Sequence, residues 1–82
     1  MFLAFTNNGP GGRDRPSYYE RGIACALDNA IDAHMWFNLA AMDGDERGAP
    51  ARAGVALDMT AREIAEAQRR ARTFFKELRQ AA

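Results

Sequence analysis

The chain has 82 residues, which is enough for one small domain with a marginal hydrophobic core. Eleven basic and eleven acidic residues give a net charge of zero, which excludes the strong uniform field typical of nucleic-acid-binding domains. The charge is uneven along the chain, because residues 28–58 carry six acids and two bases while residues 60–82 carry six bases and three acids. We therefore expect a dipolar molecule, and its complementary halves are compatible with head-to-tail association.

The amino-terminal residues predict no regular structure. Residues 7–12 read Asn-Asn-Gly-Pro-Gly-Gly, which suits neither a helix nor a strand. We expect a flexible segment over residues 1–16 and a helical domain over residues 17–82. The apolar residues 1–5 have two interpretations, a frayed terminus or a segment that docks into a groove of its own chain or of a neighbour.

The first helix is expected to begin after Ser17. Ser17 follows a proline, and Glu20 three residues later completes a capping-box pattern. The helix is predicted to run from residue 18 to about residue 27, with Gly22 allowing a close approach. Its expected buried side chains are Ile23, Ala26 and Leu27. Asp28 and Asn29 then either turn the chain or cap the next helix.

The second and third helices are bounded by glycine and proline. The second is predicted over residues 30–42, and Gly44 ends it because glycine readily adopts a left-handed conformation. The third is predicted over residues 49–57, with Pro50 in its first turn, where a missing N–H costs little.

The fourth helix is predicted over residues 61–80 and starts at a second capping box, Thr60 with Glu63. Glu66 and Arg70 form a favourable pair four residues apart. The expected apolar line is Ile64, Ala67, Ala71, Phe74 or Phe75, and Leu78. Nothing in the sequence predicts a strand, so the fold class is all-α, with about four helices.

The second helix carries the most informative pattern in the chain. Ala33, Phe37, Ala40 and Ala41 fall on one helical face, and Trp36 and Leu39 widen it. Small residues in such a stripe let a second helix come close while the aromatic rings fill the space beside it. The residues expected to make this hairpin packing are Ala33, Trp36, Phe37, Ala40, Ala41 and Gly44.

This pattern resembles the Sel-1-like repeat, an α/α solenoid module related to the tetratricopeptide repeats. Residues 57–68 look like the closing helix that follows the last repeat in many bacterial members, so the resemblance covers residues 18–75. The chain departs from the family pattern at Arg21-Gly22, where a leucine-glycine pair is usual, and at Asp28-Asn29, which replaces a longer glycine-rich loop.

The resemblance implies a short array of helical hairpins that binds partner segments in a shallow groove lined by the first helices. The residues that it places at the groove are Tyr18, Tyr19, Gly22 and Ala26. Repeat arrays normally need about three units, and this chain has one repeat plus a trailing hairpin. We expect self-association, a partner or good capping to make up the difference.

Residues for catalysis or metal binding are scarce. His34 is the single histidine and lacks a second His or Cys at ligand spacing, so we expect it to be a partly exposed residue that hydrogen-bonds across the hairpin. Ser17, the only serine, and Thr60 are both explained as caps. We therefore expect no enzyme activity, no catalytic or metal residues and no cofactor.

The last helix offers a second set of partner-binding candidates. Phe74 and Phe75 cannot both point inward, and whichever one points outward is a candidate interface anchor, flanked by Arg70 and Lys76. The sequence favours a small adaptor or a regulatory subunit that binds protein. The alternatives are a nucleic-acid-associated protein that uses the basic last helix, or a homodimer whose copies complete each other's core.

The cellular compartment is predicted from the cysteine content and the apolar runs. Cys25 is the only cysteine, so no internal disulfide forms, a reducing compartment is expected, and its apolar flanks predict a buried position. No stretch approaches the roughly 20 apolar residues of a membrane span. Residues 1–5 are too short for the apolar region of a signal peptide. We expect a cytoplasmic bacterial protein.

Overall fold

The computed structural model describes residues 15–81. It contains four α-helices and no strand within those residues: α1 Tyr18–Cys25, α2 Ala30–Met42, α3 Gly48–Ala56 and α4 Ala61–Ala81. The all-α class is confirmed, and no helix end differs from its expected position by more than two residues. Residues 1–14 of the expected flexible segment lie outside the described residues. The expected docking of residues 1–5 therefore also concerns residues that are not described.

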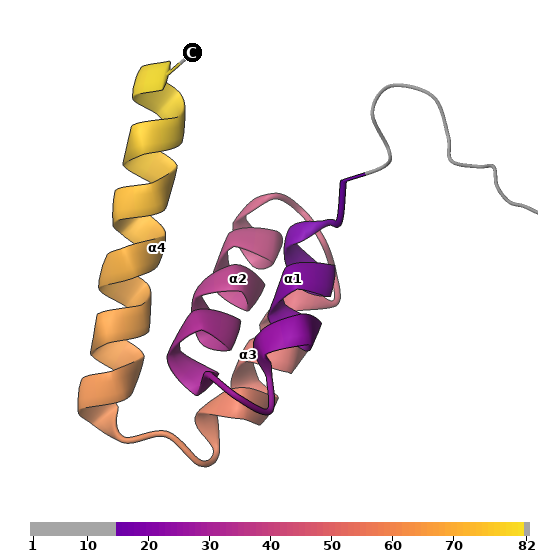
Figure 1. The fold of residues 1–82 in the computed structure, drawn as a ribbon, viewed down its shortest axis with the longest axis vertical. Helices are drawn as coiled ribbons and strands as arrows, with labels where there is room; N and C mark the ends of the chain where they lie inside the picture. Colours follow the sequence, from indigo (N-terminus) through magenta and orange to yellow (C-terminus); the bar gives the residue numbers. More distant parts are fainter. Residues whose placement is uncertain (1–14, 82) are drawn as a thin grey trace, which may run out of the picture.

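Helix α2 is the centre of the fold, because α1, α3 and α4 each pack against it. Successive helices reverse direction and are joined by short turns (Figure 1). A helix contacted on several sides is apolar nearly all round. This explains the buried residues of α2, which are Ala33, His34, Met35, Phe37, Leu39 and Ala40.

Local hydrogen bonds fix where the helices start. The capping box of α1 forms as expected: the Ser17 N–H donates to Glu20 Oε1 at 2.9 Å and the Glu20 N–H donates to Ser17 Oγ at 3.1 Å. Asn29 caps α2, since its Oδ1 accepts from the Asp32 N–H at 3.0 Å. The capping alternative for the Asp28-Asn29 turn is therefore the one observed.

Two glycines let helices approach α2 closely. A methyl group added at Gly22 of α1 would lie 2.4 Å from a ring carbon of Phe37, and one added at Gly48 of α3 would lie 2.5 Å from the backbone nitrogen of Ala41. At both places a Cβ atom would collide with α2. The small residues thus position α1 and α3 against the central helix.

Three aromatic rings join α4 to the rest of the domain. Tyr18 of α1, Trp36 of α2 and Phe74 of α4 form an aromatic cluster with ring centroids 5.5 to 6.1 Å apart. They pack against the buried core of Met35, Leu39 and Ala71. Because α4 meets α2 mostly through the small residues Ala67 and Ala71, this cluster contributes the largest apolar side chains to that contact.

An ion-pair network holds α4 to α2 beside this cluster. Arg70 Nη1 lies 2.9 Å from Asp32 Oδ1 of α2, and Arg70 Nε lies 2.7 Å from Glu66 Oε2 one turn away. The expected pairing of Glu66 and Arg70 is confirmed.

Several burial expectations were wrong. Ile23 and Leu27 were expected to be buried but are 52% and 100% exposed, because α1 ends at Cys25 and no helix within residues 15–81 covers its final turn. Leu78 is 49% exposed, since α4 extends beyond the other helices (Figure 1). His34, expected to be partly exposed, is only 2% exposed, and Cys25 is half-buried rather than buried.

Candidate protein-interaction site

An open apolar groove of about 600 Å³ lies between α1 and α3 and is called here the α1–α3 groove. Phe37 of the central helix forms part of its lining. Seven apolar side chains line it: Ile23, Ala26, Leu27, Ala30, Phe37, Ala51 and Val55. Since large exposed apolar patches are uncommon on small monomers, this groove is the leading candidate site for a partner.

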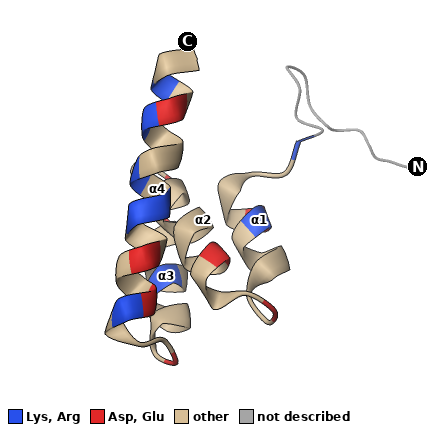
Figure 2. Ribbon diagram, turned by 60° about the vertical axis from the view of Figure 1, so that its left-hand side comes forward, with Lys and Arg blue, Asp and Glu red and all other residues tan. Residues whose placement is uncertain are grey.

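The α1–α3 groove has one acidic residue in its lining and a second one next to that lining in the sequence. Asp58 lines it, and Asp28 directly follows Leu27; both are exposed, and neither forms an ion pair within residues 15–81. The α1–α2 and α3–α4 turns that carry these residues lie at the end of the molecule opposite the carboxyl terminus (Figure 2). An apolar groove with an acidic rim favours an apolar segment flanked by basic side chains.

A second apolar surface, the α4 end, lies at the other end of the molecule. Phe75 and Leu78 are 38% and 49% exposed, and with Tyr18, Leu39, Met42 and Asp43 they border a small hollow of about 60 Å³. The Arg79 guanidinium lies 5.7 Å from the centre of the Phe75 ring. This surface is therefore apolar, with the basic Arg79 and the acidic Asp43 at its edges.

The candidate residues of α1 are mostly used inside the domain, which corrects the expectation that they face an open groove. Tyr18 belongs to the aromatic cluster, and Gly22 is buried against Phe37. Tyr19 lies 5.8 Å from the Phe37 ring and under the Arg47 guanidinium at 4.1 Å. Among the four, Ala26 lines the α1–α3 groove.

The candidates on α4 divide into packing and exposed residues. Phe74 points into the aromatic cluster while Phe75 and Lys76 are exposed, which confirms that the two phenylalanines face different ways. Arg70 is engaged by carboxylates of α2 and α4. Hydrogen bonds from Arg69 and Arg70 lower the pKa of Glu66 to about 2, so the Glu66 carboxylate stays ionised near neutral pH and keeps its ion pairs with both arginines.

The residues expected to pack the repeat hairpin lie in the interior or at its turn. Ala33, Phe37 and Ala40 are at most 2% exposed, while Trp36 and Ala41 are half-buried. Gly44 has a φ of 89°, the left-handed conformation expected at the end of α2.

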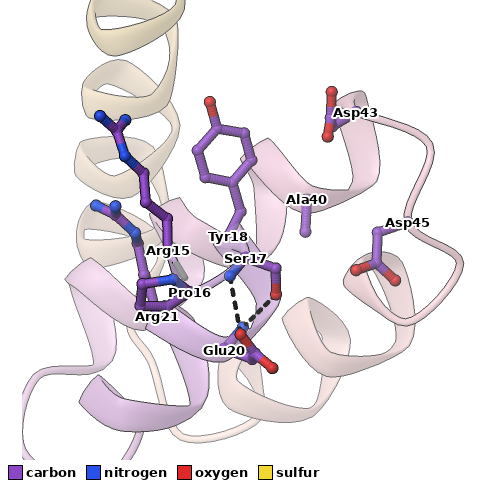
Figure 3. Close-up of a pocket in the computed structure, with 9 residues that line it drawn as sticks. All are labelled: Arg15, Pro16, Ser17, Tyr18, Glu20, Arg21, Ala40, Asp43 and Asp45. Carbon is purple, nitrogen blue, oxygen red and sulfur yellow. Dashed lines mark hydrogen bonds between the residues drawn. The ribbon is translucent and has the colours of Figure 1, made fainter. Parts of the chain in front are cut away.

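A polar hollow near the start of α1 is the other notable depression (Figure 3). Arg15 and Arg21 lie on one side of it, and Asp43 and Asp45 lie on the other, with Tyr18 between them. Some of its polar groups are engaged: Ser17 and Glu20 bond each other, and Asp45 pairs with Arg47 at 2.8 Å. Arg21 lies 5.1 Å from the centre of the Trp36 ring, and its buried Nε has no hydrogen-bond partner among the described residues.

His34 is a buried core residue. Its Nδ1 has no hydrogen-bond partner among the described residues. Burial, aided by the nearby positive charge of Arg52, lowers the pKa of His34 below its ordinary 6.5, so the neutral imidazole is favoured in the folded protein. Within residues 15–81 no group of three His, Cys, Asp or Glu side chains is placed to hold a metal ion, and no helix is long and apolar enough to cross a membrane.

Ile23, Leu27 and Met42 are surface residues that sequence reasoning did not assign to a site. Leu27 carries a usable signal, because it stands just before the Asp28-Asn29 turn, where a helix end leaves a side chain uncovered. Comparison of the chain with protein-family models, curated proteins and solved structures finds no match.

Proposed function

We propose that this protein is a non-catalytic protein–protein interaction module that binds an apolar, basic-flanked segment in the α1–α3 groove. The observation that carries the proposal is the groove itself: Ile23 and Leu27 stand uncovered beside the Phe37 ring, with Asp58 at the edge. Covering such side chains provides the hydrophobic driving force for association, at about 25 cal/mol per Å² of apolar surface.

The wider assignment is a small adaptor or regulatory subunit of a bacterial, cytoplasmic assembly built on a Sel-1-like repeat hairpin. The buried alanine and aromatic face of α2 supports the hairpin, because it lets α1 and α3 pack closely on the same helix. The free thiol of Cys25 supports a reducing compartment.

A non-catalytic role is supported by how the reactive side chains are used. The Ser17 and Thr60 hydroxyls accept capping hydrogen bonds, and His34 is buried in the core. None of these groups faces the α1–α3 groove, so binding is the chemistry that the groove favours.

Nucleic-acid binding by α4 has less support. Arg69 and Arg70, two of the six basic residues that the alternative relies on, pair with Glu66 and Asp32. These ion pairs compete with phosphate contacts.

Site-specific photocrosslinking tests the proposed function. The full chain, carrying benzoylphenylalanine in place of Leu27, is irradiated in the organism that encodes it, and linked proteins are identified by mass spectrometry. The matched control carries the same group at Ala53, an exposed position on α3 outside the groove lining. We expect a defined product from position 27 that position 53 does not give.

Dependence on the groove is tested by adding Ile23→Asp to the Leu27 crosslinker. The product is expected to disappear, because a carboxylate in the apolar wall is costly to desolvate. A product that survives Ile23→Asp, or identical products from positions 27 and 53, would overturn the assignment.

A further inference from the structure

We propose that the occupant of the α1–α3 groove is the α4 end of a second copy of this chain, so that copies associate head to tail. The inference rests on the proposed function, because it names the partner that fills the same groove. It is carried by three observations: the shape of the α4 end, the charges at both surfaces, and their positions at opposite ends of the molecule.

The α4 end has the side-chain spacing of a helix that binds in a groove. One face of α4 carries two apolar side chains, Phe75 and Leu78, which are three residues apart. Arg72 lies three residues before Phe75, and Arg79 directly follows Leu78. All four are exposed. Apolar anchors at such spacing are the usual means by which a helix enters an apolar groove.

The charges of the two surfaces are complementary. Phe75 and Leu78 of α4 lie between Arg72 and Arg79 in the sequence. The two arginines are seven residues apart, which is about 10 Å along the helix. Asp58 lines the groove and Asp28 directly follows its lining residue Leu27, and neither aspartate forms an ion pair within residues 15–81. At the α4 end, the three basic residues Arg72, Lys76 and Arg79 outnumber the acids Glu77 and Asp43 and leave a net positive charge.

The positions of the surfaces determine the kind of assembly. The last turns of α4 project from one end of the molecule, and the acidic turns beside the groove lie at the other (Figures 1 and 2). A contact between two different surfaces is heterologous, so each copy keeps one free groove and one free α4 end. Copies then add end to end, as repeats do within a longer solenoid.

Two single-surface variants test the inference by complementation. Leu27→Asp disables the groove and keeps the α4 end, whereas Phe75→Asp disables the α4 end and keeps the groove. Each variant alone is expected to lose at least about 30-fold in association constant, the loss typical of a central interface anchor. Sedimentation equilibrium of an equimolar mixture is expected to show a heterodimer of twice the 9.1 kDa chain mass that grows no further.

Matched controls separate association from folding. Leu57 is 85% exposed and outside the groove lining, so Leu57→Asp is expected to associate like the unmodified chain. Helix content by circular dichroism is expected to be equal in all variants, because Leu27 and Phe75 are exposed. The mixture is also informative by itself, since a variant that had lost its fold would not complement the other.

Other outcomes identify a different occupant and overturn the inference. A groove-to-groove dimer would survive Phe75→Asp, and a contact between two α4 ends would survive Leu27→Asp. Loss of association in a Phe2→Ser/Phe5→Ser double variant would assign the groove to residues 1–5.

The proposed function can fail or stand separately from this inference. A chain that stays monomeric at high concentration, yet still gives a groove-dependent crosslink to another protein from position 27, contradicts self-association and leaves the interaction module in place. Absence of both the assembly and the crosslink contradicts both.

Discussion

Gly22 and Gly54 are both glycines inside helices, but their surroundings differ. A Cβ atom at Gly22 would lie within 2.5 Å of two ring carbons of Phe37, whereas a Cβ atom at Gly54 has nothing within 4 Å. The same substitution therefore has opposite consequences at the two sites. Packing decides the outcome at Gly22, and backbone entropy decides it at Gly54.

We predict that Gly22→Ala lowers the free energy of unfolding by about 2 kcal/mol, because the buried Phe37 ring has to move and α1 separates from α2. Gly54→Ala is expected to raise it by about 0.5 kcal/mol through helix propensity. Urea unfolding followed by circular dichroism measures both. Equal effects of the two substitutions would contradict the close approach of α1.

The buried His34 predicts a pH-dependent stability. Its folded-state pKa lies below the ordinary 6.5, so the unfolded chain binds a proton more readily than the folded one. Stability is therefore complete above about pH 6.5 and falls as the pH decreases below that value, by at most about 1.4 kcal/mol per pH unit for one proton.

The measurement is urea unfolding between about pH 7.5 and about pH 5, a window in which Glu66, with its pKa of about 2, stays ionised. His34→Gln is the control, and its unfolding free energy is expected to change little across the window. A decline that persists in His34→Gln would assign the pH dependence to other groups.

At the scale of the helices, the adjacent residues Phe74 and Phe75 give a matched comparison. We predict that Phe74→Ala lowers the free energy of unfolding by about 2 to 3 kcal/mol, since it removes a ring that packs on Tyr18 and Trp36. Phe75→Ala is expected to cost less than about 1 kcal/mol, because that ring is partly exposed. Thermal unfolding of dilute protein measures both, and the reverse order would mean that α4 packs on its other face.

The helix bounds could be predicted from the sequence because local groups determine them. The Ser17 and Thr60 caps and the left-handed Gly44 each act within a few residues, and each lies where the sequence indicates. The exposure of Ile23 could not be predicted in the same way, because it depends on where α3 lies relative to α1. Periodicity identifies an apolar face but does not say which helix covers it.

The candidate site was predictable only in part for the same reason. The α4 pattern correctly indicates one inward and one outward phenylalanine, since both cannot share a helical face. Tyr19 and Gly22 were assigned to a partner groove, yet they pack on Phe37, because α2 is central and takes the first helix on its aromatic face. The groove itself forms between α1 and α3, which only the tertiary structure brings together.

At the scale of the whole molecule, the order of the helices determines where the charged side chains lie. Asp28 and Asp58 lie in the turns α1–α2 and α3–α4 at one end, and Arg72, Lys76 and Arg79 lie toward the other end of α4, where the α2–α3 turn adds the acid Asp43 (Figure 2). Arg70 is neutralised within the domain, while Arg72, Lys76 and Arg79 remain exposed toward the carboxyl end of α4. Attraction between the exposed arginines of α4 and the aspartates beside the groove favours the head-to-tail contact at low salt and does so less at high salt.

The final prediction follows from the heterologous contact. The weight-average mass by light scattering is expected to rise continuously with protein concentration, passing twice the 9.1 kDa chain mass without a plateau there.

Raising NaCl from about 0.05 M to about 0.5 M is expected to reduce the association constant about threefold to tenfold, because salt screens the rim aspartates and the α4 arginines while the apolar contact remains. Asp28→Asn/Asp58→Asn removes the rim charges and is expected to remove most of this salt dependence. A plateau at twice the chain mass would instead indicate a closed symmetric dimer.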